Sequence, residues 1–440
     1  MTAKDCTSCC NLCRLFQSHP QSGDDDILHC TGTWKDLKGY GNANSVHGVR
    51  ITSYEHLALV ARCSKNKGQE LGVDTHVVSE QSLKKRLGLL EYEMWKRRGY
   101  EICPQRDHHA EYDRAKFMES VVIPMLGACH VPLMKCARLR EIGAGSTLTK
   151  DVLLMPDATL LARGQATSDT VCVEIKPKFG NILTCDTVPL HERTLKHTKS
   201  RYSLHQILKL EQGSISSRSA YDPLDLFSNQ KERMVRALIA LFDNPQNNLS
   251  VFCGGHRCPL DDVRGLCKSI VQTMFPSDTV TSCAEETLSI ILAEILLQEN
   301  VLQNILTMQN ACQYDVQAVE KLVNRLVSPD VEISSKTDEP SLALERLLTF
   351  EKEKIMDIVA DYCIAATAKD CSLMISFCAS GDATTRHQPP NPCGTGAICT
   401  SLGISCMYRI TIVDLDRKPL EKIKAHAALD REIMRVNSAC

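Results

Sequence analysis

The order of its periodic segments constrains the fold of this chain more than any other feature. Between residues 31 and 190, segments with the two-residue period of strands are interspersed with two helical segments, over residues 82–100 and 112–127. Beyond residue 190 most segments have the helical period, and 440 residues are enough for two units. The pattern therefore predicts an α+β protein with two lobes and a cleft between them.

The same pattern sets the expected domain boundaries. Residues 1–30 are polar and rich in cysteine, so we expect them to form a loose leader. Residues 31–165 form the expected strand-rich N-lobe, and residues 166–440 form the mainly helical C-lobe. The leader contains two Cys-x-x-Cys pairs within residues 6–13. Because no Cys or His pairs follow at the spacing of a zinc finger, clustered thiols are favoured over a zinc site there.

Composition narrows the class of protein. A net charge of -2 and an aromatic content of 5% argue against nucleic-acid binding, so any anion site must be built locally. The most apolar run, residues 287–297, is short and contains Glu294, which predicts a packed helix and no membrane span. No targeting peptide is recognisable, so the 23 cysteines are expected to be reduced thiols. We expect a monomer inside the cell, in the cytoplasm, the nucleus or both.

Two helices are marked by their end residues. Gly213 is expected to end a helix over residues 198–213, because glycine adopts the left-handed backbone conformation that closes many helices. Ser228 is expected to cap the N-terminus of a helix over residues 228–244.

The stretch VCVEIKPKFG, residues 171–180, has the alternating pattern of a half-buried strand. This pattern places Glu174, Lys176 and Lys178 on one face. Pro177 removes a backbone donor, which indicates a strand that ends or lies at an edge. Taken alone, such a face is more often simply solvated than functional.

Basic residues also recur at four-residue spacing in two expected helices, which places them on one face of each helix. They are Lys418, Lys422 and His426 in a helix expected to begin at Pro419, and His205 and Lys209 in the earlier helix. A single basic stripe is usually solvated. Together with Lys176 and Lys178, the two stripes would form a pocket for several phosphates if the fold brought them together.

Two aspartates and a glycine-rich turn suggest the chemistry. Asp370 stands just before an expected strand over residues 371–377, and Asp414 lies at the end of another over residues 407–415. Phosphoryl transfer needs one carboxylate near the hydroxyl proton and another that holds Mg²⁺. The turn GYGNAN, residues 39–44, could cover phosphates with its backbone N–H groups, although it is not a Walker A loop. The combination favours a kinase that acts on an anionic acceptor.

Several long motifs resemble one family. They are EIKPK (174–178), RYSLHQILKLE (201–211), YDPLDLFS (221–228), PQNN (245–248), AATAKDCSLMISF (365–377) and VDLDRKPLEKI (413–423). In this order they resemble the inositol-pentakisphosphate 2-kinases, whose signature is Glu-x-Lys-Pro-Lys, and the plant members in particular. The resemblance runs from about residue 34 to about residue 429.

The resemblance implies a two-lobed fold similar to protein kinases. It also implies ATP-dependent phosphorylation of the 2-hydroxyl of inositol 1,3,4,5,6-pentakisphosphate, which yields inositol hexakisphosphate (phytate), with Mg²⁺ as cofactor. Asp370 would be the catalytic base, Lys176 would stabilise the transferred group, and Asp414 would bind Mg²⁺ near the nucleotide. The residues implied for ATP are Gly41, Asn42, Ala43, Asn44, Arg62, Asp157, Glu174 and Asp414. Those implied for the inositol phosphate are Lys67, Lys178, His205, Lys209, Asn247, Lys418, Lys422 and His426.

The sequence departs from the family pattern at several of these places. Tyr40 stands where the family has Glu, and Ser250 stands where plant members have an Arg that contacts nucleotide. Lys422 and His426 replace an Arg and a Tyr. Plant members also carry a structural zinc site, but the matching region here has no Cys or His, so we expect no zinc. The alternative to an active kinase is an inositol polyphosphate-binding protein with impaired catalysis.

Overall fold

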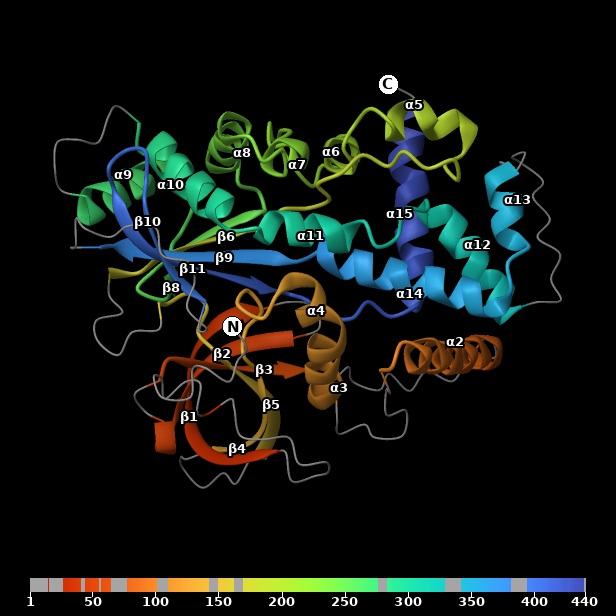
Figure 1. Cartoon of the computed structure of the whole chain (residues 1–440), viewed down its shortest axis with the longest axis horizontal. Helices are drawn as coiled ribbons and strands as arrows, with labels where there is room; N and C mark the ends of the chain where they lie inside the picture. The colour runs from red at the N-terminus through yellow and green to blue at the C-terminus, as the bar shows by residue number, and fades with distance from the viewer. Residues whose placement is uncertain are drawn as a thin grey trace.

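Two β-sheets and many helices make up an α+β fold, which confirms the expected fold class (Figure 1). The computed structural model describes residues 15, 27–40, 44–54, 57–64, 77–100, 110–141, 149–161, 169–275, 283–328, 342–380 and 394–438. Within these residues, no helix is long and apolar enough to cross a membrane.

The first sheet is a closed barrel. Its strands are β1 (Leu28–Tyr40), β2 (Asn44–Ile51), β3 (Leu59–Ser64), β4 (Lys135–Glu141) and β5 (Thr149–Pro156). They follow the order β1-β2-β3-β5-β4, and the ring closes where β1 and β4 pair in parallel. Alternate side chains point inward and form a separate apolar core that includes Val49, Ile51, Leu139 and Leu154. The strands expected on either side of the glycine-rich turn are thus confirmed.

The second sheet has six antiparallel strands. They are β6 (Val171–Ile175), β7 (Leu249–Cys253), β8 (His256–Arg257), β9 (Ser372–Ala379), β10 (Thr395–Cys399) and β11 (Ser405–Val413), in the order β10-β11-β9-β6-β7-β8. The sequence predicted β6, β9 and β11. It missed β7, β8 and β10, which have five residues or fewer and lie next to helical segments or a Pro/Gly-rich loop.

Three helices connect the barrel to the rest of the described structure. They are α2 (Val77–Arg97), α3 (Ala110–Phe117) and α4 (Ile123–Leu126). A π-helical turn over Met118–Val122 widens the helix directly before Pro124, and Gly127 ends it at φ 86°. The helical segment expected over residues 112–127 is therefore confirmed, and it ends where it was expected to end. Trp95, Tyr100 and Phe117 pack edge-to-face within the larger core, not within the barrel.

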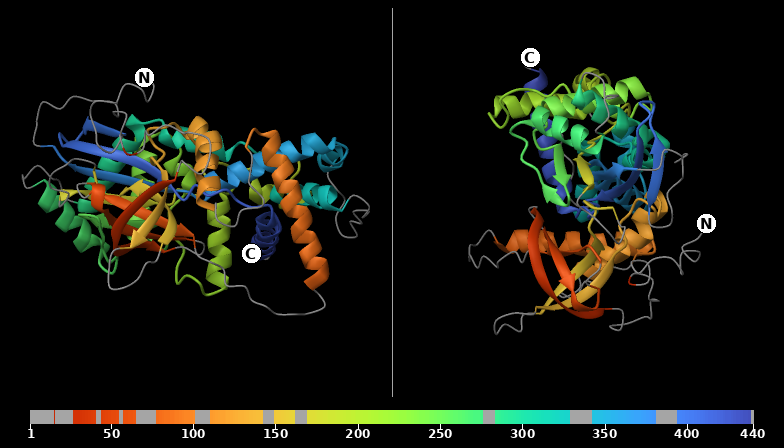
Figure 2. Two further views of the ribbon diagram at one scale, coloured as in Figure 1. Left: turned by 90° about the horizontal axis from the view of Figure 1, so that it is seen from below. Right: turned by 90° about the vertical axis from the view of Figure 1, so that its left-hand side faces the viewer.

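The remaining helices are α5 (Arg193–Lys196), α6 (Arg201–Glu211), α7 (Pro223–Leu226), α8 (Lys231–Asp243), α9 (Val263–Met274), α10 (Ala284–Gln298), α11 (Val301–Gln309), α12 (Val316–Val327), α13 (Leu342–Leu348), α14 (Lys352–Lys369) and α15 (Glu421–Ser438). Several of these helices, among them α7 and α8, cover one side of the six-stranded sheet and the barrel lies on the other, while α12, α13 and α15 lie beyond one end of the strands (Figures 1 and 2). The packed helix predicted over residues 287–297 is confirmed, because α10 buries residues along most of its length.

The predicted helix ends are confirmed in one case and wrong in another. Gly213 follows α6 at φ 65°, and the N–H of Ser214 donates to the carbonyl of Lys209 at 2.9 Å, as in a Schellman motif. Ser228 does not cap α8, which begins at Lys231 with Gln230 at the N-cap position. The reason is local: Asn229 turns the chain at φ 56°, and the Ser228 hydroxyl accepts from the N–H of Gln230.

Candidate active site

The end of β6 keeps an alternating pattern of burial. The strand ends at Ile175, so Lys176 and Lys178 lie in the segment that follows it. Glu174, Lys176 and Lys178 are nevertheless all half-buried and alternate with the buried Ile175 and Pro177, as the sequence suggested, until the backbone turns at Lys178 with a φ of 62°. The expectation that the strand ends near Pro177 is confirmed.

Buried hydrogen bonds hold this turn in place. The side chain of Gln309 donates to the carbonyl of Lys178 at 2.7 Å and accepts from the N–H of Gly180 at 3.0 Å. The hydroxyl of Tyr221 donates to the carbonyl of Pro177 at 2.8 Å. Gln309 and Tyr221 are almost fully buried. Their hydrogen bonds therefore anchor the backbone that carries Lys176 and Lys178 to the protein core.

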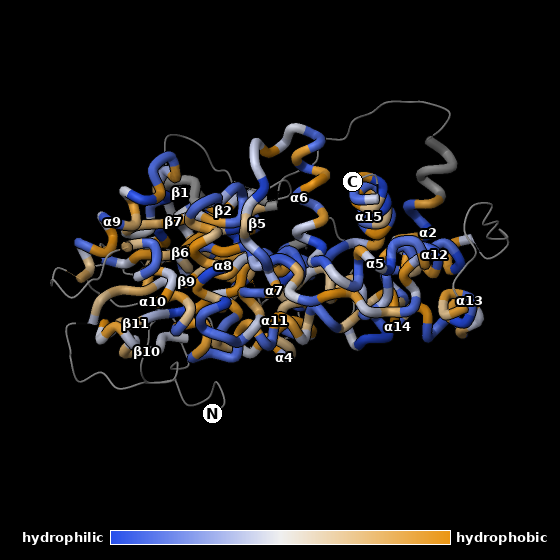
Figure 3. The backbone as a smooth tube through the Cα atoms, turned by 90° about the horizontal axis from the view of Figure 1, so that it is seen from above, coloured by the Kyte–Doolittle hydropathy of each residue, from blue (hydrophilic) through white to orange (hydrophobic). Residues whose placement is uncertain are grey.

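The two helices with basic stripes pack against each other. Leu204 and Leu208 of α6 form one apolar cluster with Ile433, Met434 and Val436 of α15. Both helices alternate hydrophobic and hydrophilic residues, as their colours indicate (Figure 3). The packing brings together two helices that are more than 200 residues apart in the sequence.

The basic residues of α6 lie close to those of the β6 turn. Burial lowers the pKa of His205 to about 4, and repulsion from Lys209, Arg201 and Lys178 adds to this shift. Burial also lowers the pKa of Lys178, with repulsion from Lys176 and Lys209 adding and the Asp370 carboxylate opposing. These shifts place His205, Lys209, Lys178 and Lys176 close together, in surroundings that disfavour additional positive charge.

Asp370 is the residue that follows the last turn of α14, just before β9. Its Oδ2 accepts a hydrogen bond from Nζ of Lys418 at 2.7 Å. Burial alone would raise the pKa of Asp370, but the ammonium groups of Lys418, Lys178 and Lys176 hold it below its ordinary value. The carboxylate is therefore ionised and faces the basic groups.

Lys418 lies ahead of α15 and not within it. The helix begins at Glu421, because residues 419 and 420 form a turn whose carbonyls accept from the N–H groups of Lys422 and Ile423. Lys418 nevertheless lines the same pocket as His426, and both Lys418 and Lys422 lie near enough to act on the His426 imidazole. Lys422 is exposed, while Nδ1 of His426 lies 3.0 Å from the hydroxyl of Tyr362, and burial lowers the pKa of His426 to about 4.

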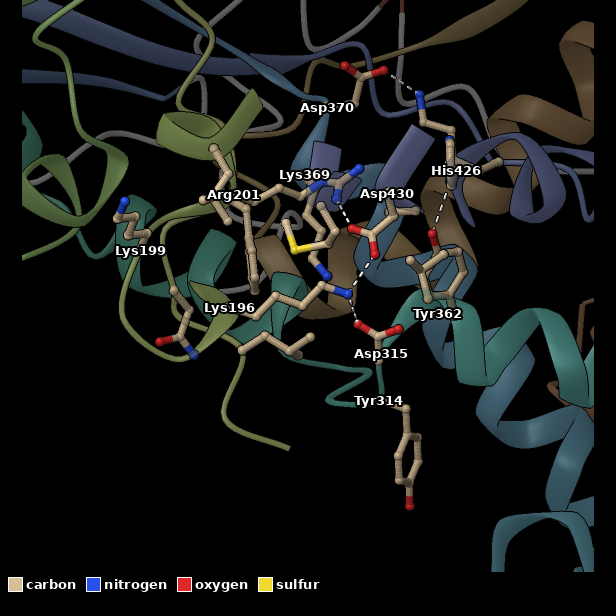
Figure 4. Close-up of a pocket in the computed structure, with 18 residues that line it drawn as sticks. Lys196, Lys199, Arg201, Tyr314, Asp315, Tyr362, Lys369, Asp370, His426 and Asp430 are labelled. Atoms are coloured by element: carbon tan, nitrogen blue, oxygen red, sulfur yellow. Dashed lines mark hydrogen bonds and ion pairs between the residues drawn. The ribbon is translucent and has the colours of Figure 1, made fainter. Parts of the chain in front are cut away.

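A pocket of about 280 Å³ opens beside Asp370 between α5, α6, α12, α14 and α15 (Figure 4). Of the predicted site residues, Asp370, Lys418 and His426 line it. The sequence analysis missed four further basic lining residues: Lys196, Lys199, Arg201 and Lys369. Arg201 is the first residue of one recognised motif and Lys369 lies within another, which is the signal that could have identified them.

A buried ion cluster forms one wall of this pocket. Nζ of Lys196 lies 2.7 Å from a carboxylate oxygen of Glu192, 2.7 Å from one of Asp315 and 2.6 Å from one of Asp430. Asp430 also pairs with Arg201. The cluster connects α5, α12 and α15 and holds the Arg201 guanidinium at the pocket, as the dashed lines in Figure 4 show.

Charged residues between β11 and α15 have partners on several elements. Asp416 pairs with Arg62 of β3 and lies 2.7 Å from Nε of Arg114 on α3. Arg417 pairs with Glu91 of α2. Arg62, which the resemblance assigned to ATP, is thus 9% exposed and bound to a carboxylate of the same chain.

The other residues assigned to nucleotide lie near the sheet. Glu174 stands opposite Ser250 and Met374 on neighbouring strands. Nη2 of Arg257, an exposed residue of β8, donates to the Ser250 hydroxyl at 3.2 Å, so a guanidinium that the sequence analysis missed lies beside this position. Asp157 is buried and accepts from the N–H of Thr159.

The remaining predictions have different outcomes. Asn247 is exposed in a turn, and the carbonyl of its neighbour Asn248 accepts from the N–H of Lys176 at 2.9 Å. Asn44 lies at the start of β2. Gly41, Asn42, Ala43 and Lys67 lie outside the described residues, as do residues 6–13 and 329–341.

The oxygen atoms around Asp414 are of the kind that hard cations prefer as ligands. Asp414 is exposed at φ 61°, and its Oδ2 accepts from the Ser372 hydroxyl at 3.3 Å. Burial raises the pKa of the Cys371 thiol to about 12, and the negative charges of Asp414 and Asp370 contribute to this rise. Both carboxylates therefore lie near Cys371. Carboxylate and hydroxyl oxygens are the ligands that Mg²⁺ prefers. In the described part of the chain, no three His, Cys, Asp or Glu side chains cluster as a complete metal site.

Comparison with known proteins gives a consistent result. The family model for inositol-pentakisphosphate 2-kinase matches residues 38–432. The chain is 33% identical over 294 residues to the inositol-pentakisphosphate 2-kinase of Oryza sativa subsp. indica, which covers 64% of this chain and 63% of the rice protein. It is 30% identical over 355 residues to that of Arabidopsis thaliana, which covers 72% and 76%. With that of Danio rerio it shares 26% identity over 378 residues, covering 69% and 73%.

Proposed function

The chain belongs to the inositol-pentakisphosphate 2-kinase family, and we propose that it transfers the γ-phosphoryl group of ATP to the 2-hydroxyl of inositol 1,3,4,5,6-pentakisphosphate. The product is inositol hexakisphosphate. The observation that carries the proposal is the ionised Asp370, held by Lys418 at the mouth of a pocket lined with cations. A neutral acceptor would not need so many basic side chains around one carboxylate.

In this mechanism Asp370 accepts the proton of the 2-hydroxyl. Phosphoryl transfer has a loose transition state, so the proton moves late and a carboxylate of low pKa is basic enough. Lys418 keeps the carboxylate ionised and oriented through their 2.7 Å hydrogen bond. Lys176, in the turn after β6, stabilises the negative charge on the transferred group.

The acceptor's phosphates are bound by the cations of the β6 turn, α6 and the start of α15. These residues are Lys178, His205, Lys209, Lys418, Lys422 and His426, and we add Asn247 and Lys67 to them from the family resemblance. The lowered pKa values of Lys178, His205, Lys209 and His426 support the assignment, because burial disfavours the charged form of each group and, for all of them except Lys209, neighbouring basic groups disfavour it further. A bound polyanion relieves this repulsion.

The nucleotide is held on the other side of Asp370. We assign Glu174 to the ribose and the backbone of residues 41–44 to the phosphates, with Arg62 and Asp157 completing the site. Asp414 is the residue that would hold Mg²⁺. When bound, Mg²⁺ neutralises charge on the nucleotide phosphates.

A two-lobed arrangement similar to that of protein kinases accompanies this function. The N-lobe comprises residues 31–165 and the C-lobe residues 166–440. Support comes from the barrel, which has an apolar core of its own, separate from the larger core around the six-stranded sheet. Helices α2, α3 and α4 contribute to the larger core, so they would join the two lobes.

A second candidate is an inositol polyphosphate-binding protein that turns over slowly or not at all. It is favoured by the pairing of Arg62 with Asp416, because a nucleotide phosphate would have to share or displace that partner. Tyr40 and Ser250 favour it as well. Arg257 weakens this alternative, since its guanidinium lies beside Ser250.

One experiment separates the two candidates. The protein is incubated with Mg-ATP and a panel of inositol phosphates, and the products are resolved by anion-exchange chromatography. A hexakisphosphate peak from the pentakisphosphate with a free 2-hydroxyl is the expected result. Binding of the pentakisphosphate by calorimetry without any product would instead identify a binding protein.

A further inference from the structure

Lys369 is a pocket residue that has no role in the mechanism proposed above. It is the last residue of α14 and directly precedes Asp370. Its side chain lines the pocket, and its Nζ lies 4.1 Å from the centre of the Phe179 ring (Figure 4). The ring belongs to the turn after β6, so Lys369 lies where the acceptor site and the pocket meet.

Lys369 differs from Lys196, Arg201 and Lys418 in having no carboxylate partner among the described residues. Lys196, Arg201 and Lys418 each pair with at least one carboxylate. For Lys369, by contrast, no Asp or Glu oxygen within the described part of the chain lies within 4.0 Å. Its contact with an aromatic face supplies only part of the stabilisation that an ion pair would give.

The surroundings confirm that this ammonium lacks compensation. Burial lowers the pKa of Lys369 to about 8, and repulsion from Arg201 adds to the shift. Cys312, Asp315 and Cys185 act in the opposite direction but do not restore the ordinary value. At pH 7 the Lys369 side chain is still mostly protonated. The pocket therefore contains a positive charge whose desolvation costs free energy.

We propose that Lys369 binds a phosphate group of the acceptor, at the side of the pocket formed by Phe179 and Arg201. The inference rests on the proposed function and adds a binding residue to it. An anionic ligand is the partner that an uncompensated ammonium favours, and a polyphosphorylated ring presents several such groups close to Asp370. The Phe179 ring restricts where Nζ can lie and so orients it toward the pocket.

A purely structural role for Lys369 predicts different behaviour. Its ammonium is near the C-terminal end of α14, where a cation stabilises a helix modestly. If that were its whole role, Lys369→Met would lower the melting temperature and would impair both substrates alike. A phosphate contact, by contrast, affects the acceptor alone.

The test uses the full chain with Lys369→Met, Lys369→Arg and the control Lys354→Met, an exposed lysine on the same helix. Calorimetry measures the Kd of the pentakisphosphate, of inositol hexakisphosphate and of a non-hydrolysable ATP analogue, and the KM of each substrate is measured alongside. We expect Lys369→Met to weaken both inositides by about tenfold or more, with the nucleotide unchanged. Lys369→Arg should retain most of the affinity, and Lys354→Met should behave as wild type.

The possible results distinguish a phosphate-binding role of Lys369 from a purely structural one. Unchanged inositide affinity in Lys369→Met, or equal losses for inositide and nucleotide, would overturn the assignment of Lys369. Because binding is measured directly, the test holds even if the wild-type protein has little turnover. A wild-type protein that bound no inositol polyphosphate at all would overturn the proposed function, and the role of Lys369 with it.

Discussion

Lys418 and Asp370 form an ion pair in which Nζ of Lys418 lies 2.7 Å from Oδ2 of Asp370. The pair joins the segment before α15 to the end of α14, two parts of the chain that both belong to recognised motifs. It also gives Asp370 a fixed orientation, although the carboxylate side chain is 62% exposed. The proposed proton transfer depends on this relationship.

Replacing Asp370 by Asn should abolish turnover and leave inositide binding nearly intact. The amide cannot accept the proton, and general-base catalysis contributes about 10²- to 10⁴-fold to a rate. Turnover is measured as hexakisphosphate formation and binding by calorimetry. Undiminished turnover in this variant would remove Asp370 from the mechanism.

Replacing Lys209 by Ala should weaken the acceptor far more than ATP. Lys209 lies on α6 beside His205 and Lys178, on the acceptor side of Asp370. The losses are compared by calorimetry with the pentakisphosphate and with an ATP analogue. Equal losses for both ligands would show that the α6 stripe does not face the acceptor.

The free protein should lose stability as the pH falls from about 6.5 to about 4. His205 and His426 have folded-state pKa values of about 4 against an ordinary value of 6.5, so the unfolded state binds protons first. Their contribution to stability is complete above pH 6.5 and is lost as the pH falls toward 4. The melting temperature is measured across this range in the wild type and in a His205→Gln, His426→Gln double variant.

Other groups also titrate in this range, so the comparison between the two proteins is what matters. The double variant should show a shallower decline than the wild type. Parallel curves would mean that the two imidazoles do not experience the desolvated, positive surroundings described above.

Replacing Lys196 by Met should destabilise the fold by about 3–5 kcal/mol, because it leaves three buried carboxylates without their shared cation. The free energy of unfolding is measured by urea denaturation. Lys199→Met is the control, since Lys199 is exposed beside the same pocket and should change stability by less than about 0.5 kcal/mol. A similar, small effect of both variants would contradict the importance of the cluster.

Replacing Arg257 by Ala should raise the KM for ATP and leave the KM for the acceptor unchanged. The Arg257 guanidinium lies beside Ser250, which stands opposite Glu174 in the sheet. A swapped variant, Ser250→Arg with Arg257→Ser, should recover nucleotide affinity because it supplies a guanidinium from the neighbouring strand. If Arg257→Ala has the KM of the wild type for ATP, Arg257 does not contact nucleotide.

The sequence predicted the elements that depend on local pattern. The helix end at Gly213, the strand end at Pro177 and the fully packed α10 follow from glycine conformation, proline chemistry and apolar content. The class of fold followed from the order of these elements. The motifs placed Asp370 and Lys418 correctly at the borders of their strands and helices, within a few residues.

What the sequence could not predict depends on contacts between distant segments. The turn at Lys178 is held by Gln309, and the pairing of Arg62 with Asp416 joins residues 354 positions apart. Lys196 was missed because two of its three carboxylate partners, Asp315 and Asp430, are 119 and 234 residues away in the sequence. Ser228 was assigned wrongly because Asn229 turns the chain before the helix can begin.

The segment between β11 and α15 has a consequence for how the protein can vary. Within five residues it directs four charged side chains to separate partners: Asp414 to Ser372, Asp416 to Arg62 and Arg114, Arg417 to Glu91, and Lys418 to Asp370. A substitution removes one of these contacts, but an inserted or deleted residue shifts every one that follows it. The segment therefore tolerates changes in composition better than changes in length, and a chimaera with a related kinase should exchange it as a single block.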